Sequence, residues 1–233
     1  MALTPQNNDV FLREVDEELR RDELRSFGQR WGLWIAAGVV ALLLAFGGWL
    51  WWQQHQLTVA GEQGEKFAQV LDDLAARKTD AVKAPLAELA TSEREGYRAM
   101  ARFTQADLLL QADDLKGAAS KFAEIAGDAS LSQPYRDLAL IRQTSAEFDS
   151  LQPAQVIDRL RGMASKDSPW FGSAGELVGI AYMRMNRPQE AGKLFAEIAR
   201  TETVPETIRQ RAVQLAGVLG VDAVDQDQET KAE

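Results

Sequence analysis

An uninterrupted apolar run from Leu33 to Trp52 constrains this chain more than any other feature. Its 20 residues include no charged or amide side chain. At a rise of about 1.5 Å per residue, a helix over this run spans about 30 Å, the thickness of the hydrocarbon core of a bilayer. Its large apolar side chains favour insertion by about 3–5 kcal/mol, whereas one central charge, in place of Leu43, costs about 3 kcal/mol. We therefore expect a single transmembrane helix over residues 33–52.

Basic residues are distributed unequally about this run. Five arginines precede it, whereas only Lys66 follows it within about twenty residues. Because positively charged flanks stay in the cytoplasm, residues 1–32 are predicted to be a cytoplasmic charged segment, with the residues after the span on the far side of the membrane. Phe11, Val15 and Leu19 lie four apart in this segment, which predicts an amphipathic helix.

Small residues repeat within the apolar run. Ala37, Ala41 and Ala45 lie at four-residue spacing, so they share one face of a helix and would let a second membrane helix approach closely. Alanine is common in membrane helices, and chance alone produces such spacing. The three alanines are a candidate membrane-helix packing face.

Composition excludes several kinds of function. The formal net charge of −9 argues against nucleic-acid binding, which needs a basic surface. Cysteine is absent, which excludes disulfides and thiolate metal ligands. The sequence has neither a Gly-rich phosphate loop nor a nucleophile–base motif, and its one histidine, His55, lies outside any metal-ligand spacing. We expect a protein that is not an enzyme, with no catalytic residue, cofactor, metal or small-molecule substrate.

An internal repeat gives the fold class. The letters FAEIA occur at residues 122–126 and again at 195–199, 73 residues later. This distance is about two tetratricopeptide units of about 34 residues each, with a few residues inserted. Because such units are helix pairs that stack on one another, the sequence predicts an all-α fold in which the membrane helix precedes a tetratricopeptide-repeat-like (TPR-like) α-solenoid.

Both copies place small and aromatic residues at the spacing of that repeat. Small residues let the two helices of a unit touch, and an aromatic ring fills the gap between them. These side chains are predicted to be structural. The positions are Ala118, Phe122, Gly179, Tyr182, Ala191 and Phe195.

The predicted organisation has five parts. Residues 1–32 form the cytoplasmic segment and 33–52 the transmembrane helix. Residues 53–93 are linking helices, one over about 59–76 and a shorter one beginning near Pro85. Residues 94–220 form the repeat domain, with helices over 134–149, 153–165 and about 205–219, and residues 221–233 are a disordered acidic tail.

Some residues of the repeat domain are candidates for a binding groove, since the first helices of such units line a concave surface. We expect most of these arginines to be solvated surface charges, and Trp170 with Phe171 to be either core or part of an exposed concave wall. The arginines are Arg98, Arg102, Arg136, Arg142 and Arg184.

The chain resembles the YfgM-like proteins, which are ancillary subunits of the bacterial Sec translocon. The resemblance covers most of residues 10–220 and depends on the single span with its Trp-rich edge and Gln54-His55-Gln56, and on the segment YRAMARFTQADLLLQADDLKGAASKF at 97–122. It implies an inner-membrane protein with a periplasmic repeat domain. The implied partners are the SecYEG translocon and a membrane-anchored periplasmic chaperone, in a non-enzymatic scaffold or co-chaperone role for exported proteins.

Two alternatives remain. The repeat domain is also consistent with a scaffold of another envelope machine, such as outer-membrane protein insertion, cell division or cytochrome maturation. An enzyme with an unrecognised site is the other alternative.

Overall fold

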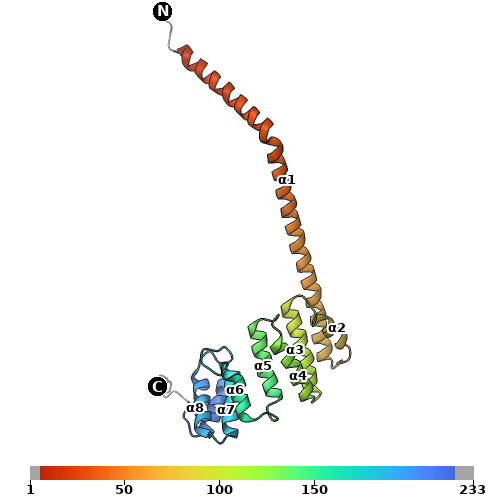
Figure 1. The fold of residues 1–233 in the computed structure, drawn as a ribbon, viewed down its shortest axis with the longest axis vertical. Coiled ribbons are helices and arrows are strands. Elements are labelled where there is room, and N and C mark those ends of the chain that lie inside the picture. The colour runs from red at the N-terminus through yellow and green to blue at the C-terminus, as the bar shows by residue number, and fades with distance from the viewer. Residues whose placement is uncertain (1–5, 224–233) are drawn as a thin grey trace, which may run out of the picture. The chain divides into compact units, whose positions relative to one another are not determined.

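The computed structural model describes the backbone of residues 6–223 and the side chains of residues 30–223. Within residues 6–223 all regular structure is helical, which confirms the all-α prediction (Figure 1). Most of the predicted acidic tail, from residue 224 on, lies outside the described residues. The helices are α1 (Gln6–Ala75), α2 (Lys83–Leu89), α3 (Glu95–Gln111), α4 (Leu115–Gly127), α5 (Gln133–Ala146), α6 (Pro153–Leu160), α7 (Phe171–Arg184), α8 (Pro188–Arg200) and α9 (Glu206–Val218).

Helix α1 is continuous through the predicted cytoplasmic segment, the apolar run and the first linking helix. No proline occurs between Pro5 and Pro85, so nothing in this stretch removes a backbone donor from the helix. The part from Arg30 onward is long and apolar enough to cross a membrane, and none of its most apolar stretch is buried by the rest of the protein.

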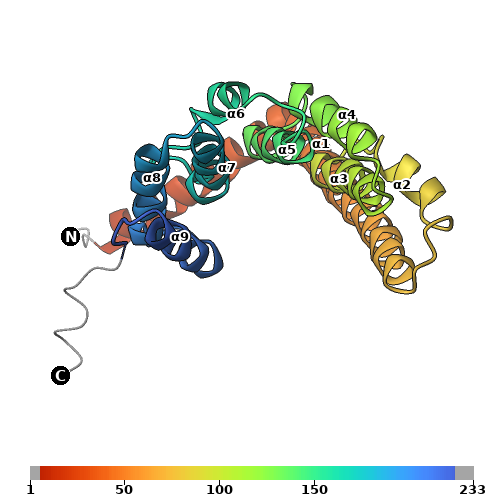
Figure 2. The same ribbon diagram turned by 90° about the horizontal axis from the view of Figure 1, so that it is seen from below.

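The chain divides into two compact units, residues 1–62 and residues from 63 onward. In the second unit α2, α4, α6 and α8 lie along the outer side of the helical array, and α3, α5, α7 and α9 lie along the inner side (Figure 2). From α2 to α9 consecutive helices pack on one another, and so do consecutive inner helices from α3 to α9. The buried side chains form a series of local clusters along the array, which is the arrangement expected of a solenoid.

The helix boundaries confirm the internal repeat. Helices α4 and α8 each have 13 residues, and both ends of α8 are 73 positions after those of α4. Helices α5 and α9 also begin 73 positions apart. Proline in the first turn of α5, α6 and α8 supplies a preorganised φ angle where no intrahelical donor is needed.

One turn geometry recurs between the helices of three pairs. Arg77, Asp113 and Asn186 each have φ near +60°, and they lie two residues after the ends of α1, α3 and α7 respectively. In all three turns the next backbone N–H donates to the carbonyl oxygen five positions earlier, with N···O distances of 2.8, 2.9 and 3.0 Å. This is the bond that closes a Schellman-type helix end.

The recurrence shows that the end of α1 and helix α2 form a helix pair of the same kind. Phe67 and Val70 of α1 pack in one buried cluster with Leu86 and Leu89 of α2. The compact unit begins at Gln63, so the structure differs from the expected boundary at residue 94. Part of the segment assigned to linking helices therefore belongs to the array.

Helix α9 covers the last pair. It ends in a fourth Schellman-type turn, where Gly220 has φ +75° and the Val221 N–H donates to the Ala216 carbonyl oxygen at 2.9 Å. Val221 then packs over Gly192 of α8, where a Cβ atom would lie 2.6 Å from the valine side chain. Ala223 is also buried, so residues 221–223 belong to the fold and not to the tail predicted to begin at 221.

Candidate protein-interaction surface

Ion pairs join successive inner helices. Asp107 of α3 pairs with Arg142 of α5, Asp149 just after α5 pairs with Arg184 of α7, and Glu176 of α7 pairs with Arg211 of α9. In each pair the acid precedes the arginine by 35 residues. The last is bidentate, with N···O distances of 2.8 and 2.7 Å. Each acid thus binds an arginine of the next inner helix of the array.

The arginines on this side have partners inside the chain. The Arg142 guanidinium lies 5.2 Å from the centre of the Phe122 ring, and that of Arg184 lies 4.4 Å from the centre of the Phe148 ring. Burial raises the pKa of the Asp107 carboxyl, and the charge of Arg142 opposes this rise. These groups differ from the solvated charges expected from the sequence, because their charges and their stems stabilise contacts between units.

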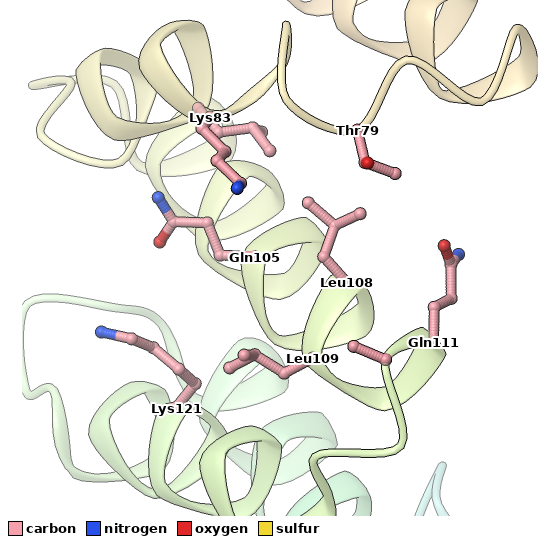
Figure 3. Close-up of a pocket in the computed structure, with 9 residues that line it drawn as sticks. Thr79, Lys83, Gln105, Leu108, Leu109, Gln111 and Lys121 are labelled. Carbon is pink, nitrogen blue, oxygen red and sulfur yellow. The ribbon is translucent and has the colours of Figure 1, made fainter.

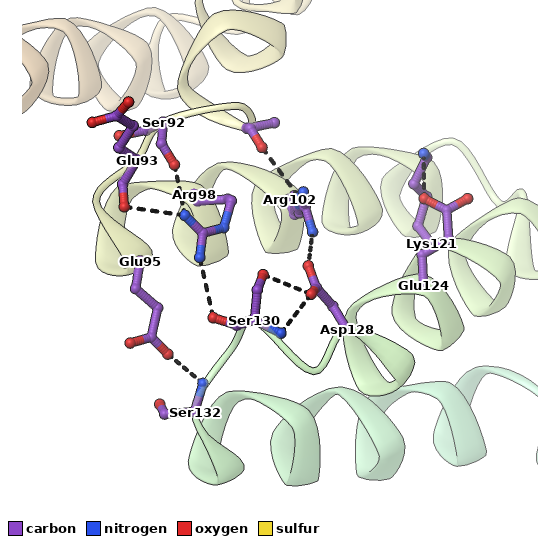
Figure 4. Close-up of polar contacts among 11 residues, drawn as sticks. Ser92, Glu93, Glu95, Arg98, Arg102, Lys121, Glu124, Asp128, Ser130 and Ser132 are labelled. Atoms are coloured by element: carbon purple, nitrogen blue, oxygen red, sulfur yellow. Dashed lines mark hydrogen bonds and ion pairs between the residues drawn. The ribbon is translucent and has the colours of Figure 1, made fainter.

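Arg98 and Arg102 of α3 bind the loop before α3 and the loop after α4 (Figure 4). Arg98 donates to the carbonyl oxygens of Ser92 and Ser130 at 2.7 and 3.2 Å. Arg102 donates to the carbonyl oxygen of Ala90 at 3.2 Å and to the carboxylate of Asp128 at 2.6 Å. Both side chains are therefore structural clamps and not free recognition groups.

Asp128 gives this network a pH dependence. Hydrogen bonds from the side chain and backbone of Ser130, with the bond from Arg102, lower the pKa of Asp128 from its usual 3.8 to about 2. A carboxyl whose pKa is lower in the folded state than in the unfolded state stabilises the fold fully at a pH above the unfolded-state pKa. This stabilisation is lost as the pH falls through the folded-state pKa. The contribution is therefore complete at neutral pH and disappears between about pH 4 and pH 2.

We expect Asp128→Ala to lower the free energy of unfolding by about 1–3 kcal/mol at pH 7, because charge-assisted hydrogen bonds are lost and Arg102 loses its partner. The difference in the free energy of unfolding between the variant and the parent protein should shrink as the pH falls from 4 to 2, as measured by urea unfolding at each pH. Asp158→Ala, in an exposed i,i+3 pair, is the control and should change stability by less than about 0.5 kcal/mol. A gap that does not vary with pH would contradict the role of Asp128.

The repeat positions predicted from sequence lie in the interior. Ala118, Phe122, Ala191 and Phe195 are fully buried. Tyr182 is half-buried, with the Arg187 guanidinium 4.9 Å from its ring centre. A Cβ atom on Gly179 would lie 2.5 Å from the Phe195 ring, so glycine makes the space that the ring fills.

Phe171 is also buried and Trp170 half-buried. Phe171 is therefore part of the core and not of an exposed concave wall.

The membrane-related residues lie on the exposed part of α1. Leu33, Leu43 and Trp52 expose 81%, 65% and 58% of their surface. Ala37, Ala41 and Ala45 are likewise exposed, and their role as a packing face stays a prediction.

Sequence reasoning missed two features of this surface. The first is the set of ion pairs between units, whose signal is the 35-residue spacing from acid to arginine. The second is a pocket between α2 and α4. No sequence pattern indicates this pocket, because the first helix pair, the end of α1 with α2, shares no repeated sequence with the other pairs. Within residues 30–223 no group of three or more His, Asp or Glu side chains lies close enough to hold a metal ion.

Comparisons with known proteins bear on the repeat fold. Neither a curated protein nor a solved structure matches the chain. The sequence model of a family described as a tetratricopeptide repeat-like domain matches residues 25–216, which is most of the chain. Such domains are protein-interaction folds, in which stacked helix pairs present extended binding surfaces. The chain therefore belongs to the tetratricopeptide repeat-like domain family.

Proposed function

We propose that this protein is a single-span membrane scaffold, or co-chaperone, that assists exported proteins at the Sec translocon. In this role residues 1–32 are cytoplasmic, and the repeat domain lies in the periplasm beside SecYEG and a membrane-anchored periplasmic chaperone. The observation that supports it is the union of one exposed apolar helix with a TPR-like array in the same chain. Neither part alone would suggest a scaffold fixed at a membrane.

Three further points favour this proposal. The five arginines before the apolar run and the scarcity of basic residues after it favour a cytoplasmic N-terminus. The resemblance to YfgM-like proteins supplies the translocon and the chaperone as partners. The array itself offers helix faces and grooves for protein segments.

Affinity purification of the full chain from detergent-solubilised membranes tests the partners. We expect translocon subunits and a periplasmic chaperone to co-purify with the full chain and not with a chain truncated after Glu62, which keeps the apolar run and lacks the compact array. Recovery of neither partner would reject the proposal. Recovery of subunits of another envelope machine would favour the alternative scaffold role.

Protease protection tests the orientation separately. Protease added to spheroplasts should degrade residues after about 60, whereas intact cells should protect them. Protection in spheroplasts, with degradation only after the inner membrane is opened, would place the repeat domain in the cytoplasm and contradict the proposal.

A further inference from the structure

A pocket of about 680 Å³ lies between α2 and α4, with α3 beneath it (Figure 3). Its origin is the short outer helix of the first pair. Helix α2 has 7 residues, and turns occupy residues 79–82 before it, whereas the equivalent helices α4 and α8 have 13 residues each. The end of α3 is therefore left partly uncovered on the outer side of the array.

The floor of this pocket is apolar. Leu86 of α2 is fully buried, whereas Leu108 and Leu109 of α3 are only half-buried. Figure 3 shows the last two side chains directed into the hollow. Covering them with an apolar side chain would remove surface from water, at about 25 cal/mol per Å².

The rim of the pocket carries two exposed lysines. Among the described residues that line it, the charged ones are Lys83 and Lys121, on opposite walls. Each lysine pairs with an acid three residues away, Asp80 at 2.7 Å and Glu124 at 2.8 Å. Such exposed pairs contribute little, so a carboxylate held in the pocket can replace Asp80 or Glu124 as the partner of an ammonium group. The two ammonium groups are therefore exchangeable donors at the edge of an apolar hollow.

The hollow continues along the seam between the outer helices. A second pocket of about 300 Å³ shares Gln105 and Lys121 with the first and extends to Ile125. Gln105 and Gln111 offer amide groups to the main pocket, and amides both donate to and accept from a peptide backbone. An elongated groove with this lining suits an extended chain better than a compact ligand.

We propose that the groove between α2 and α4 binds a short extended peptide segment of a partner protein. In this complex a large apolar side chain covers Leu108 and Leu109, and carboxylates of the segment pair with Lys83 and Lys121. The inference adds a location and a partner chemistry to the scaffold role, and it depends on that role only in taking the occupant to be a protein.

A peptide-display selection on the purified full chain in detergent tests the proposal. From a random dodecapeptide library we expect sequences with a large apolar residue flanked by Asp or Glu. Synthetic copies should bind by fluorescence anisotropy, and their Kd should rise about tenfold or more in K83E/K121E, because two attractions become repulsions. Ala112→Trp, at an exposed position lining the pocket, should have a similar effect because the indole occupies the hollow without removing core atoms.

Lys193→Glu, on an exposed part of α8 away from the groove, is the matched control and should leave the Kd unchanged. Circular dichroism of each variant verifies the fold. Selected peptides without acidic residues, or with affinities insensitive to both groove variants, would overturn the proposal. Dodecanoate could instead displace the selected peptides while an acidic peptide with an amidated C-terminus fails to bind. This result would assign the pocket to a lipid tail and would also overturn the proposal.

The selection uses purified protein and peptides. Its failure would leave the translocon pull-down unchanged, and a failed pull-down would leave the groove and its peptide chemistry intact. The two proposals are therefore tested independently.

Discussion

Replacing Phe195 by alanine is expected to lower the free energy of unfolding of the repeat domain by about 3–5 kcal/mol. The Phe195 side chain is fully buried in the cluster that joins α7, α8 and α9. Its ring occupies the space left by Gly179, so alanine would leave a cavity that the surrounding helices cannot close fully. The loss should appear in urea unfolding of the full chain in detergent and in faster hydrogen exchange of α7–α9.

The matched controls separate this cavity from a general effect of truncation. Val218→Ala removes an apolar side chain that is 81% exposed, and it should change stability by less than about 0.5 kcal/mol. Phe122→Ala, at the equivalent buried position 73 residues earlier, should cost about as much as Phe195→Ala but should speed exchange in α3–α5. A cost below about 1 kcal/mol for Phe195→Ala would contradict the assigned core.

Gly179 shows why the buried positions of this core could be predicted from the sequence. Small and aromatic residues at the repeat spacing have one steric purpose, which is the close contact of two helices around one ring, and FAEIA marks the same helix in both copies. Fold class, repeat length and most helix positions were therefore predictable. The two helices of the first pair were also predicted, over about 59–76 and from near Pro85, but their place in the array was not. Their turn has Arg77 at positive φ, where Asp113 and Asn186 occupy the other two turns. A long residue at that position gives no turn signal.

The surface was harder to predict, for an electrostatic reason. Acidic and basic residues occur along most exposed faces of this chain, so composition alone does not tell a clamp such as Arg102–Asp128 from a solvated charge. The pocket between α2 and α4 depends on how short α2 is relative to α4. Helix ends are the least certain part of any sequence-based assignment, so this hollow appears only when the helices are in place.

Leu43→Arg is expected to release up to about half of the protein from the membrane fraction. Leu43 lies near the middle of the apolar run and is 65% exposed on α1. The rest of the protein does not bury the most apolar stretch of this helix. An arginine at the centre of a span costs about 3 kcal/mol, against a total of about 3–5 kcal/mol in favour of insertion. The insertion equilibrium should therefore shift by about a hundredfold, measured as the share of the chain that resists carbonate extraction.

Two arginine substitutions on the same helix make this result specific to depth in the bilayer. Leu71→Arg lies on α1 beyond the apolar run, at a side chain that is 50% exposed, and it should leave membrane association unchanged. Leu33→Arg lies at the edge of the run, where the long side chain reaches the headgroups, and it should have an intermediate effect. Equal retention of all three variants would mean that protein partners, and not the apolar run, hold the chain at the membrane. A graded loss from position 71 through 33 to 43 is the pattern that a single bilayer-spanning helix requires, because only burial in hydrocarbon makes the same charge more costly toward the centre.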